Sequence, residues 1–79
     1  MNEAHVHDIM QMMMETGEVY TRESLKKAII NQFGITTTFC SCSENGMTPA
    51  EAVTFLENRG KFIPTEEGFY TDESMKCSH

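Results

Sequence analysis

The chain has 79 residues, of which 39% are hydrophobic, and its 6 Lys and Arg against 12 Asp and Glu give a formal net charge of −6. A chain of this length supports one small domain, here residues 1–79, and it has no apolar run near the roughly 20 residues that span a bilayer. The scattered basic residues exclude the footprint of a nucleic-acid-binding module, and the first residues lack the pattern of an export signal, so we expect a cytoplasmic protein with neither nucleic acid nor a membrane as partner.

The first segment with helical periodicity is DIMQMMMETG, residues 8–17. Asp8 and Gln11 fit an N-cap and its partner three residues later, and Gly17 fits the end of a helix. The i, i+3, i+4, i+7, i+8 spacing of an amphipathic helix is met by Val6, Ile9, Met10, Met13 and Met14. We therefore expect a helix after Asp8, with Met12 as the methionine that lies off its buried stripe.

A second helix is predicted between Thr21 and Gly34, because Thr21 is a favourable N-cap and Gly34 a favourable stop. Tyr20, just before the cap, is expected to pack on Leu25. The next segment, ITTTFCSC (residues 35–42), is rich in β-branched and aromatic residues and predicts a strand. Strand alternation gives it one face with Ile35, Thr37 and Phe39 and another with Thr36, Thr38, Cys40 and Cys42.

The third helix has the strongest start signal, in MTPAEAVTFLENRG (residues 47–60). Thr48 is the expected cap, Pro49 the first helical residue and Glu51 the partner in a capping box, with Gly60 at the end. The segment KFIPTEEGFYTD (residues 61–72) predicts two short strands around a Glu-Glu-Gly turn. The order ααβαββ predicts an α+β domain in which three helices pack against a small antiparallel sheet and the C-terminal tail folds back.

The cysteines and histidines of the chain all fall into three short pairs: His5-Val6-His7, Cys40-Ser41-Cys42 and Cys77-Ser78-His79. In a reducing compartment the three cysteines are thiols, and their odd number argues against a closed disulfide framework. Two donors separated by one residue point to the same side of an extended backbone, which makes each pair half of a tetrahedral zinc site. The pairing of all six residues therefore predicts metal binding.

The histidine pair can act in this way only outside a helix, because side chains at i and i+2 do not face each other on a helix. With Asp8 as the N-cap, His5 and His7 precede the first helix. We therefore expect an extended backbone at these two histidines.

The six donors exceed the four that Zn²⁺ takes, and two ligand sets remain open. One set is Cys₃His, formed by Cys40, Cys42, Cys77 and His79. The other is His₂Cys₂, formed by His5, His7, Cys40 and Cys42, with the C-terminal pair as a second, exchangeable donor pair. Thiolate ligands favour Zn²⁺, with Cu(I), iron and nickel as alternatives.

Two other interpretations have less support. Met10, Met13 and Met14 lie on the apolar stripe, so their thioethers are expected to pack in the core rather than to bind Cu(I). The His-x-His start is similar to that of metallohydrolases, but Asp8 follows His7 directly and the other ligands of such a site are missing. There is no nucleophilic triad and no phosphate-binding glycine loop, so no catalytic residue is predicted.

The segments HVHDIMQMM, YTRESLKKAI, FCSCSENGMTPAEAVTFL, GKFIPTEEGFYTD and the final CSH together resemble the YecH-like family of small bacterial proteins. The resemblance covers nearly the whole chain and implies metal binding without a particular activity. It implies candidate ligands at His5, His7, Cys42, Cys77 and His79. The chain departs from the family pattern at Val6, where a small residue is expected, and at Cys40, where His is expected.

The sequence thus predicts a cytoplasmic metal-binding protein, with Zn²⁺ in a structural or metal-handling role. If this prediction is right, Cys77 and His79 lie within a few ångströms of Cys42. The alternative is an acidic regulatory module that binds a protein partner and whose cysteines are incidental. An enzyme ranks third, because it would need an open metal position beside a general base such as Glu44 or Asp8, and nothing in the sequence selects either.

Overall fold

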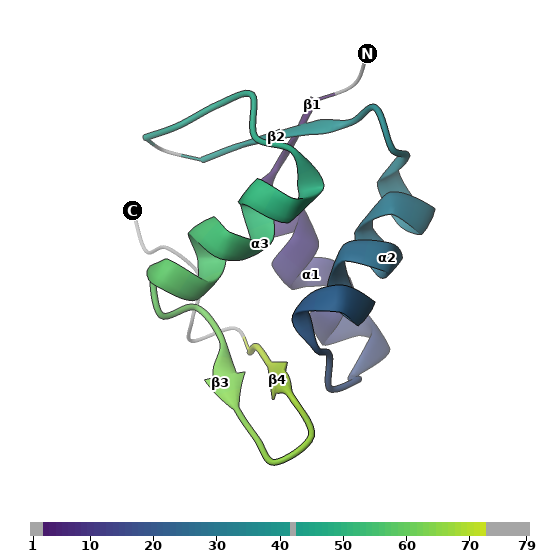
Figure 1. The fold of residues 1–79 in the computed structure, drawn as a ribbon, viewed down its shortest axis with the longest axis vertical. Coiled ribbons are helices and arrows are strands. Elements are labelled where there is room, and N and C mark those ends of the chain that lie inside the picture. Colours follow the sequence, from purple (N-terminus) through teal and green to yellow (C-terminus); the bar gives the residue numbers. More distant parts are fainter. Residues whose placement is uncertain (1–2, 42, 73–79) are drawn as a thin grey trace.

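The computed structural model of the chain describes residues 3–41 and 43–72. The elements in these residues are, in chain order, β1 (Glu3–His5), α1 (Val6–Thr16), α2 (Arg22–Phe33), β2 (Thr38–Cys40), α3 (Pro49–Asn58), β3 (Ile63–Pro64) and β4 (Phe69–Tyr70) (Figure 1). The α+β class with three helices is confirmed. The expected order ααβαββ and the single antiparallel sheet are wrong, because a strand precedes α1 and the strands form one parallel and one antiparallel pair. The expected return of the C-terminal tail concerns residues 73–79, outside the described ranges.

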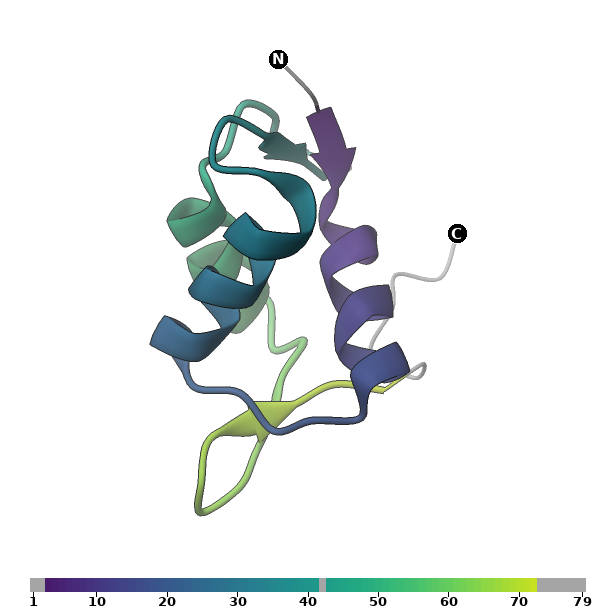
Figure 2. The ribbon, with the colours of Figure 1, turned by 90° about the vertical axis from the view of Figure 1, so that its right-hand side faces the viewer.

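The parallel pair joins the start of the chain to its middle (Figure 2). A parallel connection needs a long crossover, and α1 and α2 supply it here. The register places Glu3 opposite Thr38, Ala4 opposite Phe39 and His5 opposite Cys40. On its other side β2 is bridged to Met47, whose backbone exchanges hydrogen bonds of 2.8 and 3.0 Å with Phe39. The short strand β2 is therefore paired on both edges.

β2 is shorter than the strand predicted over residues 35–42. The chain first turns after α2, because the Thr37 N–H donates to the Gly34 carbonyl (3.2 Å) and the Thr37 hydroxyl donates to the Phe33 carbonyl. Ile35 lies in this turn and is 73% exposed, whereas Thr37 and Phe39 are buried. The predicted alternation therefore holds for Thr37 and Phe39 and fails at Ile35.

Helix α1 begins earlier than expected, and its N-cap is His5 rather than Asp8. The His7 N–H donates to His5 Nδ1 (3.0 Å), while Asp8 is the third helical residue and accepts from the His5 N–H (3.1 Å). Asp8 therefore completes a capping box instead of opening the helix. As a consequence, His7 lies inside the first turn of α1, and the prediction that both histidines precede the helix is wrong.

Helices α2 and α3 begin and end as their sequences predict. Thr21 and Thr48 are the N-caps, each in a capping box, with Ser24 and Glu51 as the respective partners. Gly34 follows α2, and Gly60 follows the last residues of α3 with a left-handed φ of 69°. Side-chain hydrogen bonds to the first backbone N–H groups thus account for both starts.

The hairpin β3–β4 is antiparallel, with Ile63 opposite Tyr70 and Pro64 opposite Phe69, as expected. It is joined to the segment between α1 and α2, because Tyr20 and Phe69 exchange two backbone hydrogen bonds of 2.7 Å. A hairpin this short has little stability alone, so this bridge anchors it to the helices.

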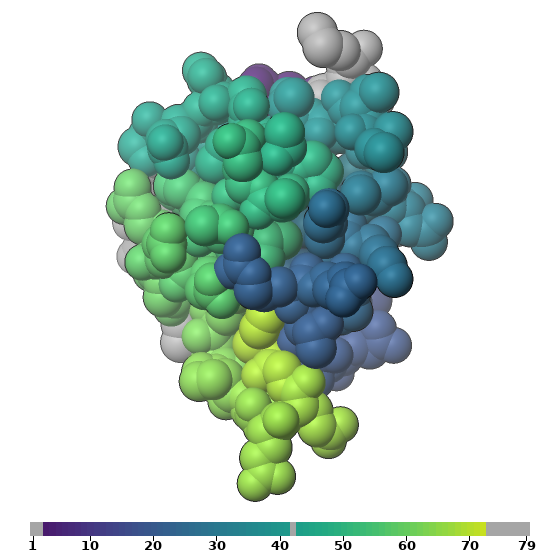
Figure 3. Space-filling view, viewed as in Figure 1, coloured from purple at the N-terminus to yellow at the C-terminus, as the bar shows by residue number. Residues whose placement is uncertain are grey.

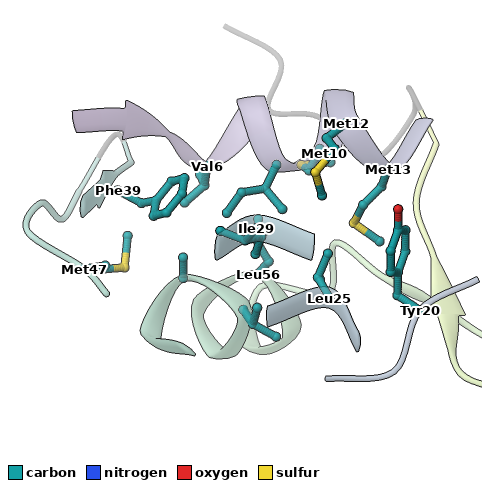
Figure 4. Close-up of a cluster of buried hydrophobic side chains, with 13 residues drawn as sticks. Val6, Met10, Met12, Met13, Tyr20, Leu25, Ile29, Phe39, Met47 and Leu56 are labelled. Carbon is teal, nitrogen blue, oxygen red and sulfur yellow. The ribbon is translucent and has the colours of Figure 1, made fainter. Parts of the chain in front are cut away.

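The core lies between α1 on one side and α2 and α3 on the other, with side chains from all three meeting in its centre (Figure 4). Met12, expected to lie off the buried stripe, is 9% exposed and belongs to the core, whereas Met14 is only half-buried. The buried cluster consists of Val6, Ile9, Met10, Met12, Met13, Tyr20, Leu25, Ile29, Phe39, Met47, Ala52, Val53 and Leu56.

On the surface, α2 and α3 form one continuous face above the projecting hairpin (Figure 3). Arg22 of α2 pairs with Glu57 of α3 and donates to the Thr54 hydroxyl (2.8 Å), which links the two helices at this face. Within the described part of the chain, no helix has both the length and the apolar character needed to cross a membrane.

Candidate functional site

Two of the predicted metal donors are neighbours across the parallel sheet. His5 ends β1, Cys40 ends β2, and the register places them directly opposite each other. Opposite residues of paired strands project to the same side of a sheet, and the core residue Phe39 occupies the alternate position. His5 and Cys40 are both half-buried. The fold therefore brings together a soft and a borderline donor that are far apart in the sequence.

His7 lies beside His5 although it is part of α1. The two imidazole rings have centroids 4.3 Å apart and planes inclined by 53°. The His7 Nε2 atom is buried. The two histidines are thus brought close by the turn at the helix start rather than by an extended strand.

The N-cap role of His5 constrains any metal ligation by its ring. A neutral imidazole has one nitrogen that accepts and one that carries a proton, so a ring accepting at Nδ1 holds its proton on Nε2. A metal ion at either nitrogen takes a lone pair, and a metal at Nε2 requires the proton to move to Nδ1 or to leave. A neutral His5 therefore cannot bind a metal and accept the His7 N–H at the same time.

The predicted ligands divide into two groups. His5, His7 and Cys40 are described by the structure, whereas Cys42, Cys77 and His79 lie outside the described residues, as does the expected approach of Cys77 and His79 to Cys42. Within residues 3–41 and 43–72, no group of three His, Cys, Asp or Glu side chains is placed to hold a metal ion. The described residues thus contribute a pair of facing donors, not a complete ligand set.

A small cavity adjoins the two histidines. Its volume is about 190 Å³, and its polar lining comes from His5, His7, Ser41, Ser43, Arg59 and Lys61. Its apolar lining comes from Val6, Met10, Phe55 and Leu56. Three segments that are distant in the sequence meet here: the β1–α1 junction, the loop after β2, and the chain that leaves α3.

Arg59 and Lys61 are site residues that the sequence analysis did not single out. Arg59 lies over the Phe55 ring, with its guanidinium carbon 4.9 Å from the ring centroid, and its Nη2 donates to Ser43 Oγ (3.2 Å). The signal in the sequence was the Arg-Gly-Lys run at the end of the third helix, where two of the six basic residues stand beside a helix stop. Nothing in that run shows that it faces His5 and His7.

Comparison with known proteins places the chain in a family. Residues 2–78 match the family described as "Protein of unknown function (DUF2492)". The chain is 48% identical over 79 residues to "Uncharacterized protein YecH" of Escherichia coli (strain K12), a match that covers 100% of both chains. No solved structure matches the chain.

Proposed function

The chain belongs to the DUF2492 family, and from that premise we propose that it is a small metal-binding protein that holds Zn²⁺ through Cys and His side chains. The observation that carries the proposal is the register of the parallel sheet, which sets His5 opposite Cys40. This pair supplies one sulfur donor and, when His5 releases the His7 N–H, one nitrogen donor, in the mixed form that Zn²⁺ accepts. Family membership confirms the YecH-like resemblance. The family's description names no ligand, so the proposal of a metal is argued from the Cys and His residues of this chain.

The proposed site uses His5 and Cys40 with further donors from His7, Cys42, Cys77 and His79, of which the last three lie outside the described residues. Thiolate and imidazole ligands favour Zn²⁺ in a cytoplasmic protein, with Cu(I), iron and nickel as the competing ions. The role is structural or metal-handling. In a domain with so small a core, a metal that binds only the folded state adds directly to its stability.

The first experiment measures metal content and melting temperature. Protein purified without chelator is expected to carry about one equivalent of zinc by elemental analysis. Zinc in hundredfold excess over its dissociation constant adds about 2.7 kcal/mol, which corresponds to a rise in melting temperature of about 10–20 °C for a domain of this size. Less than a tenth of an equivalent of metal, together with no rise in melting temperature on adding zinc, would contradict the proposal.

Matched variants locate the site. His5→Asn removes the imidazole but keeps a good N-cap, and Cys40→Ser removes the thiol at nearly constant size; both are expected to lower bound zinc. Thr38→Ser, two residues before Cys40 in the same strand, changes no donor and is expected to keep the wild-type zinc content. Equal zinc in all three variants would exclude the His5–Cys40 pair as the site.

Substitution of Cys42 and Cys77 by Ser separates a structural metal from the alternative of a protein-binding module. Unfolding of these variants supports a structural site. Loss of the metal with an unchanged melting temperature means that the metal does not stabilise the fold, and it favours the protein-binding module.

A further inference from the structure

The cavity beside His5 and His7 collects positive charge in a protein that is otherwise acidic. Two of the six basic residues of the chain, Arg59 and Lys61, line it, and no Asp or Glu of the described residues does. Among residues 3–41 and 43–72, the ion pairs are Arg22–Glu57 and Lys27–Glu23, so neither cation of the cavity is neutralised by a carboxylate there. No carboxylate of the described residues therefore competes with an added anion for these two charges.

The polar groups of the cavity are held in position. Arg59 is fixed by its contact with Phe55 and its bond to Ser43, which leave the other N–H groups of its guanidinium to donate. The backbone of Lys61 is tied at both ends, since its N–H donates to the Leu56 carbonyl (3.0 Å) and its carbonyl accepts from the Thr71 hydroxyl (2.7 Å). The anchored side chain of Arg59 and the anchored backbone of Lys61 lower the entropy cost of ordering these residues around a ligand.

A third donor that lines the cavity is Ser41. Ser41 Oγ accepts the backbone N–H groups of Ser43 (3.2 Å) and Glu44 (3.0 Å). Its own hydroxyl proton can therefore donate to another acceptor. Arg59, Lys61 and Ser41 together give the cavity several hydrogen-bond donors, which suits the two oxygens of a carboxylate.

The size and the apolar lining restrict the anion. The cavity of about 190 Å³ is smaller than the 300–1,000 Å³ typical of sites for drug-sized ligands. Its floor is built from buried side chains, with Val6 3%, Met10 0% and Leu56 1% exposed. A strongly hydrated inorganic dianion gains nothing from such a floor, whereas a short hydrocarbon chain does.

We propose that this cavity binds a small organic monocarboxylate, with its carboxylate on Arg59 and Lys61 and its short chain over Val6, Met10 and Leu56. The proposal goes beyond metal binding, because none of the residues that contact the carboxylate is a candidate metal ligand. It is therefore tested on protein freed of metal by a chelator, and it stands or falls separately from zinc binding.

The test is a nuclear magnetic resonance titration of the metal-free protein with acetate, propionate, butyrate and inorganic phosphate. Butyrate is expected to shift the amide signals of Ser41, Ser43 and Lys61 in a saturable manner. Each added methylene that is buried is expected to tighten binding about fourfold, so butyrate binds about 15-fold tighter than acetate. No saturation, equal affinity for acetate and butyrate, or phosphate binding as tight as butyrate binding overturns the proposal.

Charge variants test the carboxylate contacts. Lys61→Gln is expected to weaken butyrate binding about 10-fold or more, since a charge-assisted hydrogen bond is lost. Lys27→Gln removes the same charge from α2, outside the cavity, and is expected to leave the affinity unchanged. An equal loss of butyrate affinity in both variants means that only net charge attracts the anion, and this result overturns the proposal of a specific site. If Lys61→Gln fails to fold, the chain-length series on the wild-type protein decides.

Discussion

His5 takes two parts in the structure, as the N-cap of α1 and as the residue opposite Cys40. Its Nδ1 accepts the His7 N–H, which would otherwise be one of the unsatisfied donors of the first turn. Histidine is not among the residues that are favoured at this position, which are Asn, Asp, Ser, Thr and Gly. A histidine at the N-cap therefore stabilises the start of α1 less than Asn or Ser would.

The stability of α1 is expected to depend on an acceptor at position 5 and not on an imidazole. His5→Ala removes the acceptor and is expected to lower the free energy of unfolding by about 0.5–2 kcal/mol, whereas His5→Asn keeps an acceptor and changes it by only a few tenths. Urea unfolding of the metal-free proteins measures both. Equal losses in the two variants would show that the ring contributes by packing and not by capping.

Single residues explain which helix starts could be predicted. Thr21 and Thr48 each have a side chain favoured at an N-cap, followed three residues later by a suitable partner, and both are caps in the structure. At the first helix the same rule selected Asp8, because a carboxylate outranks an imidazole, and the cap lies three residues earlier. The helical stripe likewise excluded Met12, which the fold buries all the same.

Among the elements, the β3–β4 hairpin depends on a close approach of two backbones. Gly68 lies where a Cβ atom would meet the Tyr20 carbonyl oxygen at 2.2 Å and its carbon at 2.8 Å. The same stretch carries the Tyr20–Phe69 hydrogen bonds that tie the hairpin to the helices. Glycine at position 68 is what lets these two segments pair.

Gly68→Ala is therefore expected to destabilise the protein by about 1–3 kcal/mol or more, because the new methyl group meets backbone that cannot move aside as a side chain can. Gly46→Ala is the matched control: its φ of 68° is also positive, but a Cβ there has nothing within 4 Å. It is expected to cost only the local strain of about 1–2 kcal/mol. Thermal unfolding of both variants is the measurement, and an equal loss would exclude the close approach as the cause.

The parallel sheet shows why one element could not be predicted. β1 consists of Glu3, Ala4 and His5, none of which is among the residues enriched in strands (Val, Ile, Thr, Tyr, Phe and Trp), so its sequence carries no strand signal. The strand exists because β2 lies beside it and hydrogen-bonds to it along the edge away from Met47. The same limit applies to the site: the register of His5 with Cys40, and the cavity that both histidines line together with Arg59 and Lys61, arise only when distant segments meet.

At the scale of the whole molecule, methionine supplies an unusual share of the core. The buried methionines are Met10, Met12, Met13 and Met47, with exposures of 0, 9, 2 and 7%. Their flexible thioethers fill the space between the helices and β2. The fold class could be predicted because the apolar periodicity of the helices requires such a core, whichever methionine faces it.

This core is expected to protect its methionines from peroxide. In the folded protein, Met14 is half-buried and should be oxidised before Met10 and Met13, whose sulfurs the core encloses. A sulfoxide forced into the core should destabilise the fold by about 1–3 kcal/mol, since it adds a polar group. Peptide mass spectrometry over a time course gives the order. Simultaneous oxidation of Met10 and Met14 would mean that α1 opens freely.

The pairing of β1 with β2 also delays the folding of the chain during its synthesis. Translation delivers β1 and α1 first, while the strand that β1 needs is roughly 35 residues further along. At about 5–20 residues per second, that interval lasts about 2–7 s. Throughout it, the methionine-rich face of α1 has neither α3 nor β2 to cover it. The core therefore cannot close around α1 until both β2 and α3 have been synthesised.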